Sequence, residues 1–223
     1  MYHGPIAVFD LETTDRDPLA ARPVTCALGL LGQPIIEILV NPECAITAEA
    51  TAIHQITTEY AAANGRDRAG VIRWIRDTLE EYWGQGIPVV VFNAPFDLTI
   101  INAELRRFAM PPLRISQVID PLVLDKHADK YRKGSRKLTT MCAHYGIPLG
   151  EAAHSCVADA TASGHLAGAI LRAHPELADM DVTELHAAQV RWYREQATDL
   201  EAYFKKQGTL ADRVNKSWPM QPA

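Results

Sequence analysis

Two carboxylates follow the first hydrophobic stretch of the chain, and their spacing places them on one side of a strand. The apolar residues Ile6 to Phe9 lead directly into Asp10 and Glu12. Side chains alternate between the two faces of a strand, so residues two apart project from the same face. Two neighbouring carboxylates repel each other and lose hydration, and a hard divalent cation would offset both costs. The pair indicates either a metal site or a strand that ends in a solvated acidic turn.

Two further acidic positions stand where other predicted elements begin. Asp97 follows a short apolar strand and precedes a helix predicted to begin at Leu98, a place where ligands gather in open α/β sheets. Asp159 lies in the first turn of a helix predicted to begin at Cys156, and His154 precedes that helix. Simpler interpretations exist for each of them. Asp97 could cap its helix, Asp159 could face the helix dipole, and His154 could be an ordinary loop residue.

The pattern of apolar runs and turns predicts the elements that would position these residues. Three strands precede a series in which helices and strands alternate, which implies a mixed sheet with helices on both faces. Thr47 and Thr57 are candidate caps of two short helices. The predicted strands span 6–14, 24–31, 34–40, 89–92 and 118–119, and the longer predicted helices span 69–83, 98–108, 121–129, 138–145, 156–173 and 182–207.

Composition limits the class of protein. The chain has 223 residues, of which 48% are hydrophobic and 22% charged, so it can form a substantial core. A net charge of −5 argues against a protein that coats nucleic acid, but it allows an enzyme that grips a few phosphates. The four cysteines have no C-x-x-C spacing and fit reduced thiols. We expect a cytoplasmic protein without a signal peptide or membrane contact.

Together, the acidic positions resemble the DEDDh (DnaQ-like) 3′–5′ exonuclease family, which includes the proofreading epsilon subunit of bacterial replicative DNA polymerase. The resemblance covers about residues 5–173. It implies an α/β fold of the ribonuclease H-like class, in which helices flank a five-stranded mixed sheet. Three motifs match, at 9–14, at 93–97 with 102–105 behind it, and at 154–159. Three segments between these motifs also match, at 41–42, 52–57 and 119–122.

The resemblance also implies a reaction. Family members hydrolyse the terminal phosphodiester with two divalent ions, Mg²⁺ or Mn²⁺, and release 5′-mononucleotides. Two ions can stabilise both the attacking and the leaving oxygen of an in-line displacement. Asp10 would contact both ions, Glu12 and Asp159 would complete the shell of one, and Asp97 would act on the other. His154 would be the general base, because a histidine is mostly neutral near pH 7.

Four positions beside the motifs are implied to contact the terminal nucleotide. Core packing is an equal alternative for Phe96, and His54 could cap or pack within its loop. Three residues depart from the family pattern. None of them replaces a metal ligand or the base, so they affect only the expected shape of the nucleotide pocket. The implied contact residues are Leu11, Thr13, His54 and Phe96. The departures are Asp15 and Gln55, where the family often has glycine, and Phe92, where it often has histidine.

Several alternatives stay open at this stage. The expected substrate is a single-stranded 3′ end of DNA. Trimming of RNA ends and a noncatalytic polymerase-accessory role are the alternatives. The basic stretch 130–137 either guides phosphate or is a solvated loop. We expect an exonuclease domain over 1–175 and a C-terminal helix and tail over 176–223. The aromatic stripe of this helix favours packing on the core or in a homodimer over a surface that binds nucleic acid. A DNA polymerase is a further candidate partner.

Overall fold

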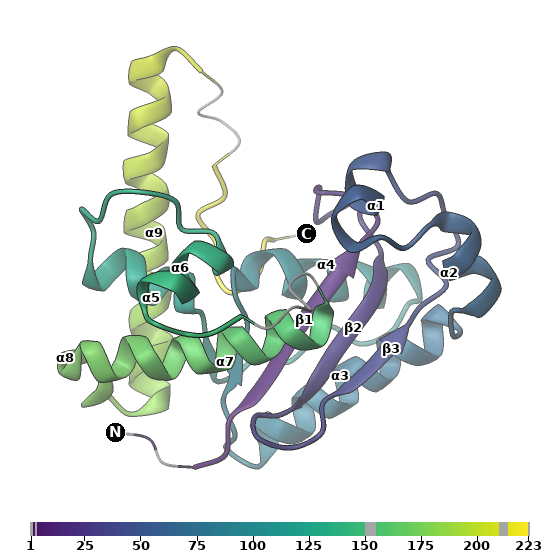
Figure 1. Cartoon of the computed structure of the whole chain (residues 1–223), viewed down its shortest axis with the longest axis horizontal. Coiled ribbons are helices and arrows are strands. Elements are labelled where there is room, and N and C mark those ends of the chain that lie inside the picture. The colour runs from purple at the N-terminus through teal and green to yellow at the C-terminus, as the bar shows by residue number, and fades with distance from the viewer. Residues whose placement is uncertain (1, 3, 150–154, 210–213, 223) are drawn as a thin grey trace.

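The computed structural model describes residues 2, 4–149, 155–209 and 214–222, and these contain a central sheet of five strands (Figure 1). The strand order is β3-β2-β1-β4-β5. β1 pairs antiparallel with β2 and parallel with β4, so the predicted mixed sheet is confirmed. The strands are β1 (Ala7–Thr13), β2 (Pro23–Leu30), β3 (Ile36–Leu39), β4 (Val89–Val90) and β5 (Val118–Ile119).

Strand β1 lies in the middle of the sheet because its first residues are apolar on both faces. Ala7, Val8 and Phe9 are fully buried, as expected for a strand covered by helices on both sides. The pairing of β1 with β2 shifts in register between Glu12 and Thr13. Irregularities of this kind re-aim side chains and are frequent beside active sites. The shift falls within the first acidic motif.

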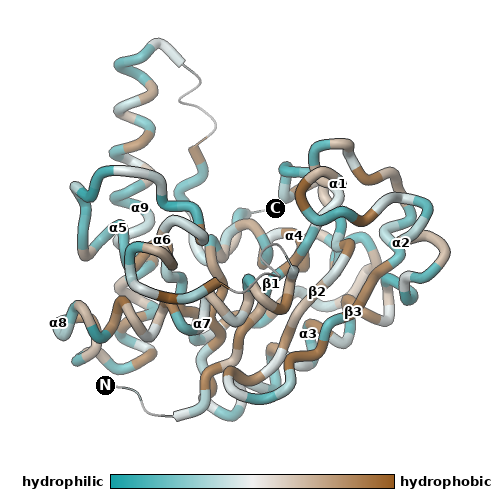
Figure 2. Tube along the Cα trace, viewed as in Figure 1, coloured by the Kyte–Doolittle hydropathy of each residue, from teal (hydrophilic) through white to brown (hydrophobic). Residues whose placement is uncertain are grey.

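Helices cover both faces of the sheet (Figure 1). On one face, α7 (Cys156–Ala173) packs against β1 and β2. This approach is close at Gly164, where an added Cβ would lie 2.7 Å from Cγ1 of Val8. Behind the sheet in this view, α3 (Arg68–Gly84) contacts both β4 and α4 (Ala94–Arg107). Hydrophobic segments concentrate in the strands and in the helix faces turned toward them (Figure 2).

Several smaller predicted helices are confirmed. The side chains of Thr47 and Thr57 each accept a backbone N–H, as predicted for the caps of α1 and α2. α5 and α6 lie against α7. These helices are α1 (Ala48–His54), α2 (Thr58–Asn64), α5 (Pro121–Ala128) and α6 (Leu138–His144).

The helix that contains Asp97 begins earlier than the sequence predicts. α4 starts at Ala94 rather than Leu98, and its N-cap is Asn93. The interpretation of Asp97 as the helix cap is therefore wrong, because this residue lies buried in the first turn. Asn93 has a left-handed backbone with φ of 59°, a conformation that asparagine tolerates. Pro95 follows in the first turn, where its missing N–H has no cost.

The C-terminal helix packs on the body of the protein from its start as far as Ala197, which is buried. α9 (Val182–Gln207) follows a short helix, α8 (Pro175–Ala178), which was not predicted. Leu185 and Trp192 are buried where α9 meets α5 and β5, whereas Leu200 is 43% exposed. The second half of α9 extends away from the sheet (Figure 1). In the described ranges, no helix has the length and hydropathy that a membrane span requires.

The tail after α9 returns to the body of the protein. Its described part has no regular structure, but Trp218 is buried and donates from Nε1 to Oδ2 of Asp120 at 3.3 Å. The backbone N–H of Gln221 donates to Oγ1 of Thr99 on α4 at 2.8 Å. The tail therefore contacts the elements that carry the acidic motifs. The division into residues 1–175 and 176–223 stays a prediction.

Candidate active site

Four carboxylates that are distant in the sequence interact at one edge of the sheet. Asp10 and Glu12 lie on β1, Asp97 lies in the first turn of α4, and Asp159 lies in the first turn of α7. Burial raises the pKa of Asp10 well above its usual range, and the charges of Asp97, Glu12 and Asp159 raise it further. The fold thus brings together the four carboxylates that the sequence singled out.

Two other members of this carboxylate cluster, Glu12 and Asp97, are also destabilised as anions. Burial raises the pKa of Glu12 to about 7, and the charges of Asp159 and Glu37 add to the shift. Burial likewise raises the pKa of Asp97, although backbone N–H groups, including that of Leu11, partly oppose it. Within the described residues, no three His, Cys, Asp or Glu side chains already form a metal-binding group. The cluster is an electrostatically coupled set that a cation would relieve.

Asp120 holds the start of α4 and was not among the predicted site residues. Its carboxylate is fully buried and accepts the backbone N–H groups of Asn93 and Ala94, both at 3.0 Å. These bonds fix the first turn of α4 and hence the position of Asp97. The signal in the sequence was the matching segment 119–122, to which no role was assigned.

Two hydrogen bonds fix the start of α7 and hold it beside β1. Oγ of Ser155 accepts the N–H of Ala158 at 3.2 Å as the helix cap. The thiol of Cys156 donates to the backbone oxygen of Asp10 at 3.0 Å. Asp159 follows within the first turn and is held near Asp10 by these contacts. His154 lies outside the described residues, so its role as general base stays a prediction.

A cavity of about 180 Å³ opens beside Glu12. It is lined by all four residues implied to contact a terminal nucleotide, namely Leu11, Thr13, His54 and Phe96. Ile53, which the sequence did not single out, also lines it and is 47% exposed although apolar. Together with Ala50 it adds hydrophobic surface suited to a base or sugar. A larger cavity of about 570 Å³ between α5 and α9 contains none of the four carboxylates.

His54 joins this cavity to the end of β1. Its Nδ1 accepts the backbone N–H of Ile56 at 3.1 Å. The ring proton of the neutral form therefore sits on Nε2, which faces the backbone oxygen of Thr13 at 3.3 Å. Burial lowers the pKa of His54, although the contact with Thr13 opposes this shift. His54 is thus a neutral donor that ties α1 to the acidic strand.

The sequence model of an exonuclease family, RNase_T, matches residues 7–167. The chain belongs to this exonuclease family. The matched range includes the whole sheet, the carboxylate cluster and the cavity. No curated relative matches the sequence.

Several solved exonuclease structures have a similar fold. E. coli exonuclease I in complex with a dA16 oligonucleotide aligns with a TM-score of 0.66 at 19% identity, over 90% of this chain and 45% of that chain. Exonuclease I from Methylocaldum szegediense gives 0.62 at 20% identity, over 89% and 45%. Exonuclease X in complex with 5′ overhanging duplex DNA gives 0.58 at 18% identity, over 82% and 99%. This chain therefore spans less than half the length of the exonuclease I structures.

In this exonuclease domain, the basic stretch 130–137 is partly committed to the fold. Arg132 and Arg136 both pair with the buried carboxylate of Asp125, which also accepts the Tyr145 hydroxyl at 2.9 Å. Burial alone would raise the pKa of Asp125, but these partners lower it. Two of the cations that could have guided phosphate therefore stabilise the loop itself.

Gln55 shows how one departure from the family pattern is accommodated. It ends α1 in the left-handed region with φ of 62°, a conformation that glycine adopts without strain. The left-handed backbone at this position also explains why the family often has glycine where this chain has Gln55. The substitution changes the cap of α1 and leaves His54 in place at the cavity.

Proposed function

We propose that the chain is a metal-dependent 3′–5′ exonuclease that hydrolyses the terminal phosphodiester of DNA, at single-stranded ends, to 5′-mononucleotides. The observation that carries the proposal is the mutual interaction of Asp10, Glu12, Asp97 and Asp159. Four carboxylates from three elements have no structural need to converge, and their repulsion costs stability. Such a cost is typical of a functional site.

These four residues would hold two divalent ions, Mg²⁺ or Mn²⁺. Their oxygen donors and their dense negative charge fit hard cations. When bound, the ions would stabilise the charges that develop on the attacking and leaving oxygens. E. coli exonuclease I has been solved in a zinc-bound complex with single-stranded DNA, which supports a metal requirement here without fixing the number or identity of the ions.

The remaining residues would bind and orient the substrate. The cavity lined by Leu11, Thr13, His54 and Phe96 would receive the terminal nucleotide next to the carboxylates. His54 would contribute a fixed neutral ring rather than a charge. His154 would accept the proton of the attacking water as the general base. The complexes of exonuclease I and exonuclease X with DNA support a DNA substrate.

The test is the digestion of end-labelled single-stranded DNA with Mg²⁺ or Mn²⁺. We expect stepwise shortening from the 3′ end and a 5′-mononucleotide product. A matched RNA oligomer of the same sequence separates DNA preference from the alternative of RNA trimming. A 3′-blocked oligomer should resist digestion, whereas shortening from the 5′ end would contradict the proposed polarity. A proofreading role beside a DNA polymerase stays a prediction.

A further inference from the structure

The loop that joins β1 to β2 places two charged residues at the cavity beside Glu12. Both Asp15 and Arg16 line the cavity. The carboxylate of Asp15 is occupied locally, because it accepts the backbone N–H of Arg16 at 2.5 Å and of Asp17 at 3.3 Å. The guanidinium of Arg16, in contrast, makes no hydrogen bond or ion pair with any residue that the structure describes.

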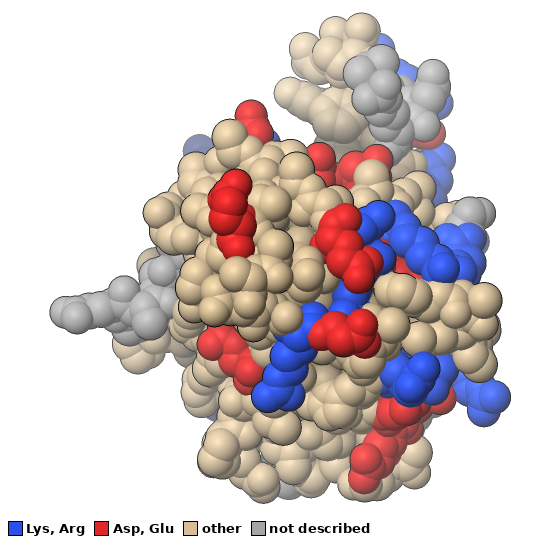
Figure 3. Space-filling view, turned by 90° about the vertical axis from the view of Figure 1, so that its right-hand side faces the viewer, with Lys and Arg blue, Asp and Glu red and all other residues tan. Residues whose placement is uncertain are grey.

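Arg16 is the single cation among the described residues that line this cavity, whose other charged members are Glu12 and Asp15. A guanidinium presents a planar set of donors that matches phosphate oxygens. On the face shown in Figure 3, the described basic and acidic side chains lie beside one another rather than in separate areas. On this face of a chain with a net charge of −5 (Figure 3), a polyanion would therefore be bound by individual residues of this kind.

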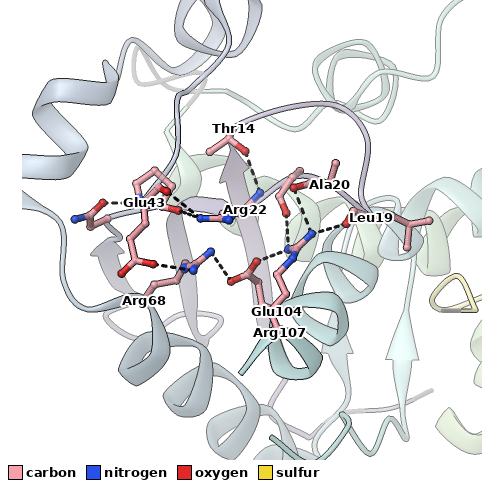
Figure 4. A network of polar contacts seen from close by, with 11 residues as sticks. Thr14, Leu19, Ala20, Arg22, Glu43, Arg68, Glu104 and Arg107 are labelled. Carbon is pink, nitrogen blue, oxygen red and sulfur yellow. Dashed lines mark hydrogen bonds and ion pairs between the residues drawn. The ribbon is translucent and has the colours of Figure 1, made fainter. Parts of the chain in front are cut away.

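The backbone of this loop is held by an arginine of α4 (Figure 4). The guanidinium of Arg107 donates to the backbone oxygens of Leu19 at 2.5 Å, Ala20 at 3.4 Å and Ala21 at 3.3 Å. Arg107 is itself paired with Glu104, whose side chain is fully buried. Three consecutive carbonyls thus converge on one side chain, which fixes the course of the loop that carries Arg16.

The same network extends to the far end of the loop (Figure 4). Glu104 also pairs with Arg68 at 3.2 Å, and Arg68 pairs with Glu43 at 2.8 Å. Arg22 immediately precedes β2 and donates from its side chain to the backbone oxygen of Glu43 at 3.0 Å, while its backbone N–H donates to Oγ1 of Thr14 at 3.0 Å. The loop is therefore anchored where it leaves β1 and where it enters β2.

We propose that Arg16 binds a backbone phosphate of the nucleic acid beside the terminal nucleotide, and that Arg107 is the residue that positions it. The inference rests on the proposed function, and it names Arg16 as the residue through which this site binds a phosphate of its substrate. It also gives a physical role to Glu104, which lies in the matching segment 102–105: its buried carboxylate holds Arg107 against the loop.

The first test measures binding of a fluorescent single-stranded DNA whose 3′-terminal linkages are phosphorothioates, in Ca²⁺. Arg16→Ala should weaken binding roughly tenfold, as expected for the loss of a charge-assisted hydrogen bond. It should also reduce the slope of log K against log salt by roughly 0.7, the value for one phosphate contact on a single strand. Arg73→Ala, which removes an exposed arginine of α3, is the matched control and should change neither quantity. Equal affinity and slope for the two variants would overturn the assignment.

The second test addresses the positioning role. Arg107→Lys keeps a cation beside Glu104 but lacks the planar group that reaches three carbonyls. It should weaken DNA binding about threefold in the wild-type background and have no further effect in the Arg16→Ala background, since it acts through Arg16. Thermal unfolding confirms that each variant is folded. Independent, multiplicative effects of the two substitutions would overturn the positioning role.

Nucleotide release by the wild-type chain reports separately on the proposed function. DNA binding that depends on Arg16 without any release of nucleotide would retain the assignment of Arg16 and contradict the exonuclease reaction. Release of nucleotide with binding that is indifferent to Arg16 would do the reverse.

Discussion

Gln189 on α9 binds the backbone on both sides of Ile119, which immediately precedes the buried Asp120. Its Oε1 accepts the N–H of Asp120 at 2.7 Å, and its Nε2 donates to the oxygen of Val118 at 3.0 Å. Gln189 is fully buried, so both bonds are shielded from water. The C-terminal helix therefore completes the hydrogen bonding of the strand end that, through Asp120, fixes the start of α4.

Gln189→Ala should destabilise the protein by about 2–4 kcal/mol. The substitution leaves a buried N–H and a buried carbonyl without partners and opens a small cavity. The measurement is the free energy of unfolding from urea denaturation. Gln207→Ala, at the exposed end of the same helix, is the matched control and should change it by less than about 0.5 kcal/mol. Equal effects of the two substitutions would show that α9 does not support the sheet.

The carboxylate cluster should make the metal-free protein less stable as the pH rises. Burial, with the neighbouring charges, raises the pKa of Asp10, Glu12 and Asp97, that of Glu12 to about 7. The unfolded chain loses these protons at the ordinary pKa of a carboxyl group, so the contribution of Glu12 to stability falls from about pH 4.5 to about pH 7, and the raised pKa values of Asp10 and Asp97 lower stability with rising pH in the same direction. Asp10→Asn removes one charge and should raise the Tm at pH 8 in EDTA. A wild-type Tm equal to or above that of the variant at pH 8 would contradict the account.

Divalent ions should reverse this loss. Mg²⁺ should raise the Tm of the wild-type protein by several degrees at pH 8 and by less at pH 5.5, where protons compete for the same carboxylates. Each 1 kcal/mol of added stability corresponds to roughly 2–4 °C for a chain of this length. The gain should nearly vanish in Asp10→Asn. A gain that is independent of pH and of Asp10 would place the ion elsewhere.

His54→Ala should raise KM for single-stranded DNA about tenfold and lower kcat less. The neutral ring lines the cavity for the terminal nucleotide and holds the oxygen of Thr13, but it does not touch the carboxylates that would carry the reaction. Initial rates over a range of oligonucleotide concentrations separate the two constants. His165→Ala, which removes an exposed histidine of α7, should leave both unchanged. A loss confined to kcat would instead place His54 in the chemical step.

Asp10→Ala and Asp159→Ala should each lower turnover to the background rate while the protein stays folded, because both would hold metal. His154→Ala should lower kcat by roughly 10²–10³ and leave metal binding nearly intact, as expected for a general base. Quench-flow or steady-state release of mononucleotide at pH 7 measures these effects. Full activity of His154→Ala at this pH would remove the histidine from the mechanism.

The helices whose ends are marked by capping residues, proline or glycine could be predicted from the sequence. α7 and α9 have the predicted bounds, because Ser155 and Asp181 cap their starts, while Pro175 and Gly208 mark their ends. The same holds for the acidic motif on β1, since a buried strand that ends in two carboxylates is visible in the residue pattern alone. The carboxylate cluster itself was predicted through the resemblance of its three motifs, which supplied the contacts between distant segments.

The features that the sequence did not reveal depend on contacts between distant residues. The start of α4 was misplaced because the bonds from Asn93 and Ala94 to Asp120 span 27 and 26 residues. Arg16 resembled any charged loop residue until the fold placed it at the cavity. Arg107 resembled an exposed helix arginine, although its partner Leu19 is 88 residues away in the sequence.

The most direct test of the account is the equilibrium binding of Mn²⁺, followed by calorimetry or electron paramagnetic resonance, to the wild-type chain and to Asp10→Asn. The wild-type chain should bind Mn²⁺ at pH 8 in the presence of a 5′-mononucleotide, with two ions per chain, and Asp10→Asn should lose most of this binding. Identical Mn²⁺ binding by the two proteins, or none by either, would contradict the claim that the four carboxylates form a catalytic metal site.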